Sequence, residues 1–142
     1  MLLMDSSIVI KIFLSAVLGI VIGLERSLSK NPAGTRTQAL VSLGACLFTI
    51  IGLSSGDFSD FSRVLPGIIM GIGFIGGGII YQPKHGEKRG LTTAADVWSV
   101  AAIGILVGMG NYDIALVGTA VILFILRPLK FLERKLGIDT AS

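Results

Sequence analysis

Long apolar segments alternate with short polar ones along the chain, and five of the apolar segments are long enough to cross a bilayer. They cover residues 7–24, 36–53, 64–81, 94–109 and 113–126. A helix needs roughly 20 apolar residues to span the hydrocarbon core, and local thinning accommodates shorter segments. Because lipid offers the backbone no hydrogen-bond partner, each segment should be an α-helix. The pattern predicts an all-α bundle of about five transmembrane helices, forming a single domain over residues 1–142.

The third segment contains GIIMGIGFIGGGII, residues 67–80, which is apolar throughout and holds six glycines. In lipid, small residues at helical spacing let two helix backbones approach closely. The predicted packing positions are Gly19, Gly23, Gly67, Gly71, Gly73, Gly77 and Gly78. Since one small bundle cannot use all of these glycines, we expect a homodimer or higher homo-oligomer with the third helix at or near the interface.

Polar residues mark the expected helix starts. Thr35 with Gln38 matches a capping box before the second segment, and Thr93 with Asp96 matches a similar signal before the fourth. Pro66 fits the first turn of the third helix, where its missing N–H is not needed. A weak similarity between residues 34–52 and 90–108 suggests an internal duplication, although small residues common in membrane helices explain it equally well.

The last helix should stop or bend at Pro128. It is followed by a basic tail, residues 127–142, in which residues 129–136 suit a short helix lying on anionic lipid. No soluble domain is expected after the last span. Lys11, one turn inside the first helix, should extend its ammonium to the interface, and a buried functional lysine is the alternative.

Basic residues collect at one end of the predicted bundle. Ten of them fall at that end, namely Arg26, Lys30, Arg36, Lys84, Lys88, Arg89, Arg127, Lys130, Arg134 and Lys135, whereas Arg63 falls in a loop at the other. The positive-inside rule makes the basic end cytoplasmic. The N-terminus is then outside and the C-terminus inside a cell membrane.

Composition agrees with a membrane protein and excludes several other classes. Hydrophobic residues make up 52% of the chain and charged residues 15%, where a soluble domain has about 25% charged residues. Five spans leave no room for a separate soluble enzyme. The lone Cys46 permits no disulfide within the chain, and neither a cofactor nor a nucleic-acid partner is expected.

Two motifs that could suggest chemistry are weak. Gly71, Gly73 and Gly76 match a dinucleotide-binding fingerprint, but that motif requires a strand, a turn and an amphipathic helix. His85 has no second histidine or cysteine near it, so a zinc site is not expected. No nucleophile is paired with a base. The chain is therefore predicted not to be an enzyme, and it has no predicted catalytic residues.

The candidate chemistry lies at the predicted cytoplasmic helix ends. Seven polar residues share a similar depth there: Glu25, Arg26, Arg36, Thr37, Thr92, Thr93 and Asp96. Arg36 stands at the positive end of its own helix dipole, so we expect Glu25 or Asp96 to pair with it. Charges at membrane depth are usually paired and often functional. The alternative is a set of ordinary helix-end charges, with Asp96 completing a cap.

Four motifs, in order along the chain, resemble those of the MgtC/SapB family of prokaryotic membrane proteins. They are GLER at 23–26, AGTRTQALVSLGACLF at 33–48, GIGFIGGGII at 71–80 and RGLTTAADVWSVAAIGILVGMGNY at 89–112. The resemblance implies an inner-membrane protein connected with growth in low magnesium, with virulence and with restraint of the F-type ATP synthase. By motif position it implies functional sensitivity at Glu25, Arg26, Arg36, Thr92 and Thr93. The acid at position 96 departs from the family pattern, which has a small or uncharged residue there.

Two functions fit these observations. The first is a non-enzymatic membrane regulator that acts by helix contact with a complex such as the F-type ATP synthase, which the glycine surfaces favour. The second is a small oligomeric magnesium transporter or channel that uses Glu25 and Asp96, because magnesium prefers carboxylates and retained waters. No acid lies in the middle of a predicted span, which counts against a complete ion pathway in one chain.

Overall fold

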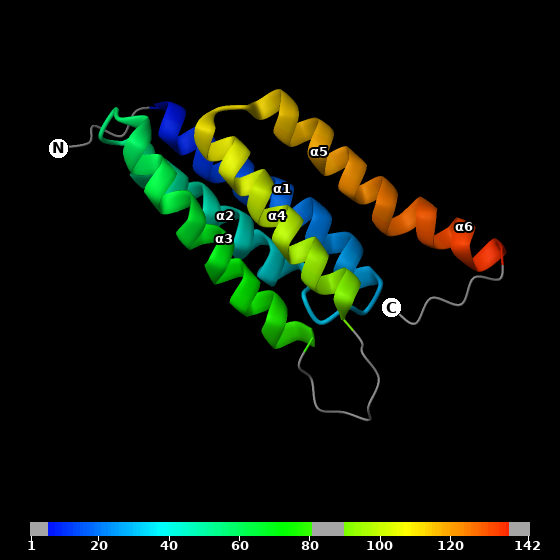
Figure 1. The fold of residues 1–142 in the computed structure, drawn as a ribbon. Coiled ribbons are helices and arrows are strands. Elements are labelled where there is room, and N and C mark those ends of the chain that lie inside the picture. Colours follow the sequence, from blue (N-terminus) through cyan, green and yellow to red (C-terminus); the bar gives the residue numbers. More distant parts are fainter. Residues whose placement is uncertain (1–5, 81–89, 137–142) are drawn as a thin grey trace.

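The computed structural model describes residues 6–80 and 90–136, and within them every regular element is a helix (Figure 1). The elements are α1 (Ser6–Leu28), α2 (Thr35–Leu53), α3 (Phe58–Ile80), α4 (Leu91–Met109), α5 (Tyr112–Phe124), the π-helical turn η1 (Ile125–Leu129) and α6 (Lys130–Lys135). Five helices, counting α5 with η1 as one, are long and apolar enough to cross a membrane. The predicted all-α, five-span architecture is confirmed, and its direction across the membrane stays a prediction.

Helix α4 is the centre of the bundle. It packs against α1, α2, α3 and α5, and half of its apolar span is buried. Its side chains Val97, Val100 and Val107 are fully buried, together with Ile22 of α1 and Cys46 of α2. Helix α3 lies along α2 and α4 at the edge of the bundle, and only 11% of its span is buried. Most of the α3 surface therefore faces lipid or another protein.

Glycines hold α2 against its two neighbours. On the α1 side, a Cβ added at Gly23 would lie 2.5 Å from Cα of Thr35, and one at Gly19 would lie 2.7 Å from the carbonyl oxygen of Gln38. On the α4 side, a Cβ at Gly108 would lie 2.7 Å from Cβ of Thr49, and one at Gly104 would overlap the carbonyl oxygen of Ser42. Real side chains do not tolerate such separations. The contacts at Gly104 and Gly108 were not among the predicted packing positions.

The predicted packing glycines of α3 behave differently. A Cβ at any of Gly67, Gly71, Gly73, Gly77 and Gly78 would meet nothing within 4 Å in this chain. Only Gly76 of this helix faces α4, at 3.6 Å from Cβ of Ala94. The five open positions do not pack against the described residues, so they face lipid or another chain, and the homo-oligomer stays a prediction.

Both predicted capping boxes are wrong. The N-caps of α2 and α4 are Gly34 and Gly90, and neither helix start has a side-chain cap hydrogen bond. Thr35 instead contacts Ser27. Its backbone N–H donates a hydrogen bond to the Ser27 hydroxyl at 2.9 Å, and the two hydroxyl oxygens also lie 2.9 Å apart. The other capping candidates, Gln38, Thr93 and Asp96, are buried in tertiary contacts described below. Although α2 and α4 each have 19 residues after a glycine cap, the internal duplication stays a prediction.

Other helix ends also differ from the sequence prediction. Helix α3 begins at Phe58, so Pro66 lies inside the helix and not in its first turn. Asp57 stabilises the earlier start, because its Oδ1 accepts a hydrogen bond from the Ser59 backbone N–H at 2.8 Å. Of the two outcomes predicted at Pro128, the helix does not stop there but passes through the π-helical turn η1 into α6, and the bend stays a prediction. Such irregular turns relieve the clash of a proline ring with the preceding turn.

Near the N-terminal end of α1, the side chain of Lys11 is half-buried. Its Nζ would lie 4.0 Å from a Cβ built at Gly110, the C-cap of α4. The negative end of the α4 dipole favours a cation there. The predicted basic loop residues Lys84, Lys88 and Arg89, and His85 with them, lie outside the described residues.

Gly104→Ala tests the glycine contacts. The added methyl group would overlap the Ser42 carbonyl, so the free energy of unfolding in mixed detergent micelles should fall by about 1–3 kcal/mol. Gly78→Ala is the matched control, because its methyl group meets open space and alanine is the better helix former. Equal stability of the two variants would contradict the close α2–α4 approach.

Asp57→Asn tests the start of α3. The Ser59 backbone N–H, with help from its hydroxyl, holds the pKa of Asp57 below its usual range. A depressed carboxyl pKa contributes stability above the unfolded-state pKa, and that contribution is lost as pH falls through the folded-state pKa. The protection factors of the amides in residues 58–62, which correct for the intrinsic pH dependence of exchange, should therefore fall in acid in the wild type, and those of the Asp57→Asn variant should depend less on pH. Identical pH profiles would exclude a charged cap.

Candidate functional site: a buried ionic cluster

One end of the bundle brings together charged and polar side chains from three helices. Helix α1 continues to Leu28, so Glu25 and Arg26 lie within its last turns, while Gln38 lies in the first turn of α2. Thr93 and Asp96 lie in the first two turns of α4. We call Glu25, Arg26, Gln38, Thr93 and Asp96 the buried ionic cluster. The glycine contacts that draw α1 and α4 onto α2 bring these residues within reach of one another.

Arg26 is the centre of the cluster and is only 3% exposed. Its Nε lies 3.4 Å from Oδ2 of Asp96, and its Nη1 lies 3.6 Å from Oε2 of Glu25. Its Nη2 donates a hydrogen bond of 3.4 Å to the Thr93 hydroxyl. One guanidinium therefore joins α1 to α4 by an ion pair and a hydrogen bond, and it makes a second ion pair within α1. A planar, forked donor suits this arrangement better than a lysine ammonium would.

Gln38 links α2 to the same carboxylate. Its Nε2 donates to Oδ2 of Asp96 at 2.5 Å and to the carbonyl oxygen of Ala33 at 3.5 Å, and the side chain is fully buried. Asp96 is 4% exposed. Asp96 thus receives contacts from α1 through Arg26 and from α2 through Gln38. A buried carboxylate is tolerated only with such partners.

Residues of the α1–α2 connection close the cluster from the helix ends. The Ser29 hydroxyl donates to Oε1 of Glu25 at 2.7 Å, and the Thr93 hydroxyl donates to Oδ1 of Asn31 at 3.4 Å. Asn31 in turn donates from Nδ2 to the backbone oxygen of Ser29 at 3.4 Å. The connection is therefore tied to α4 as well as to α1.

The charges in the cluster do not balance. Two carboxylates face one guanidinium, so with all three groups ionised the net charge is negative. Several buried cluster atoms also lack a hydrogen-bond partner among the described residues: Glu25 Oε2, Arg26 Nε, Gln38 Oε1 and Asp96 Oδ1. Uncompensated buried charge is costly, so the cluster is suited to take up a proton or a small cation. Among the described residues, no group of three or more histidine, cysteine or acidic side chains is arranged to hold a metal ion.

The predicted pairing of Arg36 with Glu25 or Asp96 is wrong. Arg36 is exposed, and neither Glu25 nor Asp96 lies within 4.0 Å of it. Both carboxylates pair with Arg26 instead, because Arg26 projects from α1 toward α4 whereas Arg36 projects away from the bundle. Thr92 is also exposed, and Thr37 lines a groove on a different face of α2.

The sequence prediction did not include Gln38, Ser29 or Asn31 in the cluster. A usable signal was present in α2, where Gln38, Ser42 and Thr49 recur on one face of an otherwise apolar helix. Polar residues inside a membrane helix usually face the protein interior. All three are fully buried in the structure.

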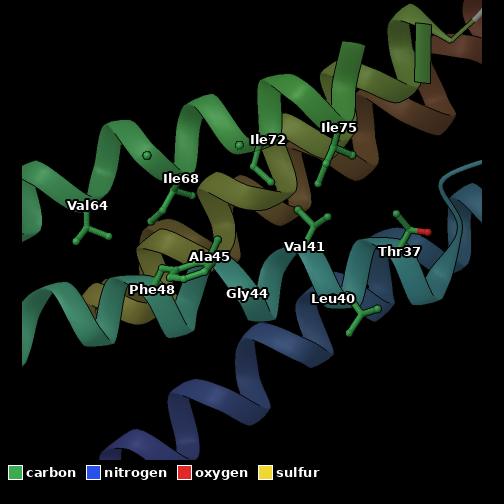
Figure 2. Close-up of a pocket in the computed structure, with 12 residues that line it drawn as sticks. Thr37, Leu40, Val41, Gly44, Ala45, Phe48, Val64, Ile68, Ile72 and Ile75 are labelled. Atoms are coloured by element: carbon green, nitrogen blue, oxygen red, sulfur yellow. The ribbon is translucent and has the colours of Figure 1, made fainter. Parts of the chain in front are cut away.

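A groove of about 710 Å³ lies between α2 and α3, and Figure 2 shows Ile68 and Ile72 of α3 pointing across it toward α2. We call it the α2–α3 groove. It is lined by Thr37, Leu40, Val41, Gly44, Ala45, Phe48, Val64, Gly67, Ile68, Gly71, Ile72 and Ile75. Three of these are glycines whose Cβ positions are open, namely Gly44, Gly67 and Gly71. The groove is a second candidate site, and its apolar lining suits a hydrocarbon or helical occupant.

Five spanning helices around a buried ionic cluster define a small multi-pass membrane protein. The chain belongs to the MgtC family, whose sequence profile matches residues 12–135. The resemblance found in the motifs is therefore confirmed. The fold has no match among solved structures.

Three relatives show the extent of the similarity. The chain is 37% identical to protein SrpB of Synechococcus elongatus, over 87% of this chain and 75% of SrpB. It is 34% identical to protein SapB of Bacillus subtilis, over 95% of this chain and 62% of SapB. It is 35% identical to the putative magnesium transporter YhiD of Escherichia coli, over 87% of this chain and 60% of YhiD. The chain thus spans less than two thirds of SapB and of YhiD.

Arg26→Ala and Arg36→Ala together test the cluster. Removing the buried guanidinium strands two carboxylates, so Arg26→Ala should lower the free energy of unfolding by about 3–5 kcal/mol in mixed micelles. Arg36→Ala, at an exposed side chain, should change it by less than about 0.5 kcal/mol. Asp96→Asn should be milder than Arg26→Ala, since it removes the excess charge and keeps an acceptor for Gln38. A larger effect at Arg36 than at Arg26 would refute the assignment.

Proposed function

We propose that this protein is a non-enzymatic membrane regulator that acts by helix contact with a larger membrane complex. The family resemblance makes the F-type ATP synthase of the plasma (inner) membrane the candidate complex. The observation that carries the proposal is the α2–α3 groove, an apolar, glycine-bordered surface that the rest of the described chain leaves uncovered.

The shape of the groove supports a helix as its occupant. Gly67 and Gly71 are one helical turn apart on one wall, and Gly44 lies on the other. Such small residues let a foreign helix backbone approach closely, which is the main source of attraction between helices in lipid. Elsewhere on α3, Met70 is 73% exposed and Phe74 is 85% exposed. These large exposed side chains extend the apolar surface of α3 that a partner helix could pack on.

The buried ionic cluster has a supporting role in this proposal. Its contacts fix α2 relative to α1 and α4, and α2 forms one wall of the groove. The cluster would therefore maintain the shape of the docking surface without contacting the partner.

A magnesium transporter is the second candidate, and one structural observation favours it. Glu25 Oε2, Gln38 Oε1 and Asp96 Oδ1, which accept no hydrogen bond from the described residues, are hard ligands of the kind that magnesium prefers. Relative YhiD is named a putative magnesium transporter. Against this candidate, the interior of the single chain continues from the cluster as packed Val97, Val100 and Val107. A pathway would need an oligomer or another conformation.

Liposomes separate the two candidates. Purified protein is reconstituted with a magnesium-sensitive dye trapped inside, and influx is compared with empty vesicles and with an Asp96→Asn variant. The regulator proposal expects no flux above empty vesicles. Magnesium influx that is lost in Asp96→Asn would overturn it in favour of the transporter.

Gly71→Leu tests the groove as the docking surface. Vesicles containing the F-type ATP synthase should show less ATP-driven proton pumping when the wild-type protein is co-reconstituted, and Gly71→Leu should abolish this effect by filling the groove. Gly78→Leu is the matched control, since Gly78 is equally open but does not line the groove. No effect of the wild type on pumping would exclude the ATP synthase as the partner.

The oligomeric mass in mild detergent tests the predicted homodimer on the same variants. If Gly71→Leu or Gly77→Leu lowers the mass, α3 lies at the homo-oligomer interface. A variant that loses dimerisation but still restrains pumping would show that a second copy, and not the complex, occupies the groove.

A further inference from the structure

Two adjoining pockets lie between α1 and the segment formed by α5, η1 and α6. The first, of about 500 Å³, extends along the spans and is lined mainly by apolar side chains such as Val21, Leu24, Leu123 and Phe124. The second, of about 390 Å³, lies at the helix ends and includes Ser29, Lys30 and Arg127. Glu25, Leu28 and Arg127 line both pockets, so the two are continuous. We call this continuous surface the α1–α5 seam.

We propose that the α1–α5 seam binds one anionic phospholipid from the surrounding bilayer. Its phosphate lies between Lys30 and Arg127, and one acyl chain lies along Val21, Leu24 and Leu123. This site is separate from the α2–α3 groove and does not depend on the proposed regulatory function.

The seam exists because α5 packs chiefly on α4. The buried residues of α5 are Ala115 and Thr119, and Gly118 lies close to Ile103 of α4. Helix α1 is packed mainly on α2 and makes far less contact with α5. In a bilayer the space between the two helices must be filled by lipid, since an empty apolar cavity forfeits dispersion contacts.

The charges at the helix ends select the kind of lipid. The side chains of Lys30 and Arg127 are exposed, and among the side chains that the structure describes, which do not include that of Glu133, neither has a carboxylate within 4.0 Å. Glu25 lines the site but its carboxylate is already engaged, with Oε1 accepting from Ser29 at 2.7 Å and Oε2 lying 3.6 Å from Arg26 Nη1. Two exposed cations at the helix-end part of this apolar seam complement a lipid phosphate, and a zwitterionic headgroup compensates them less well.

The backbone holds both cations in place. Lys30 has a left-handed conformation, with φ of 57°, in a turn closed by a hydrogen bond from its N–H to the carbonyl oxygen of Ser27 at 3.0 Å. Arg127 lies in the π-helical turn η1. Local irregularities of this kind are frequent at functional sites. Here they direct two positive side chains to one pocket from opposite sides of the seam.

Native mass spectrometry of the purified full chain in mild detergent tests the proposal. Phosphatidylglycerol and phosphatidylcholine with the same acyl chains are added in turn, and retained lipid is measured. The wild type should retain one phosphatidylglycerol, and the double variant K30Q/R127Q should bind it about tenfold more weakly. R36Q is the matched control, because Arg36 is an exposed arginine at the same end of the bundle that lines neither pocket. It should bind within about twofold of the wild type.

A variant in the apolar part gives an independent result. Ala120 lines the first pocket and is exposed, so A120F should narrow the channel and weaken phosphatidylglycerol binding without changing any charge. Inorganic phosphate at millimolar concentration should not displace the lipid. The proposal is overturned if both lipids are retained equally, if R36Q loses as much binding as K30Q/R127Q, if A120F has no effect, or if inorganic phosphate displaces the lipid.

Discussion

The close approach of α1 and α4 to α2 is the constraint on which the rest of the structure depends. Gly19 and Gly23 on one side, and Gly104 and Gly108 on the other, bring backbones to separations that no side chain would permit. At that distance the side chains at the ends of the three helices contact one another directly. The ionic cluster is a consequence, since Arg26 reaches a carboxylate on α4 and Gln38 reaches the same carboxylate from α2. The glycines supply the contact, and the cluster fixes the register.

A buried ion pair by itself is weak evidence of stability, because desolvation offsets much of the attraction. The arrangement around Arg26 is better understood as a device that specifies one packing of three apolar helices. Sliding α1 or α4 by one turn would move the glycines away from their close contacts with α2, and it would separate Arg26 from Asp96 and leave the buried Asp96 carboxylate without its cation. The surplus negative charge adds a second property, because a proton or cation taken up there would change how strongly the three helices are held together.

The sequence predicted the number, type and approximate position of the helices, since hydrophobic length alone determines which segments can cross a bilayer. The positions of the helix ends were harder to predict, because Gln38, Thr93 and Asp96 fit local capping patterns yet make tertiary contacts. The choice between Arg26 and Arg36 depends on which way each side chain points around its helix axis, and the packing partners that decide this are distant in sequence. The role of the glycines depends likewise on neighbours: the same small-residue spacing is closely packed at Gly19 and Gly23 and open at Gly67 and Gly71.

Helix α2 connects the two candidate sites through two neighbouring faces. Gln38, Ser42 and Thr49 are buried against α1 and α4, whereas Thr37, Val41 and Gly44 line the α2–α3 groove. A rigid helix cannot shift one face without shifting the other, so the strength of the cluster and the shape of the groove are linked through its position. Such a link is reciprocal: an occupant of the groove that prefers one position of α2 must alter the affinity of the cluster for a proton or cation by the same free energy. In an ion-sensitive regulator α2 would have two stable positions, whereas in a protein that only docks on a partner it would have one.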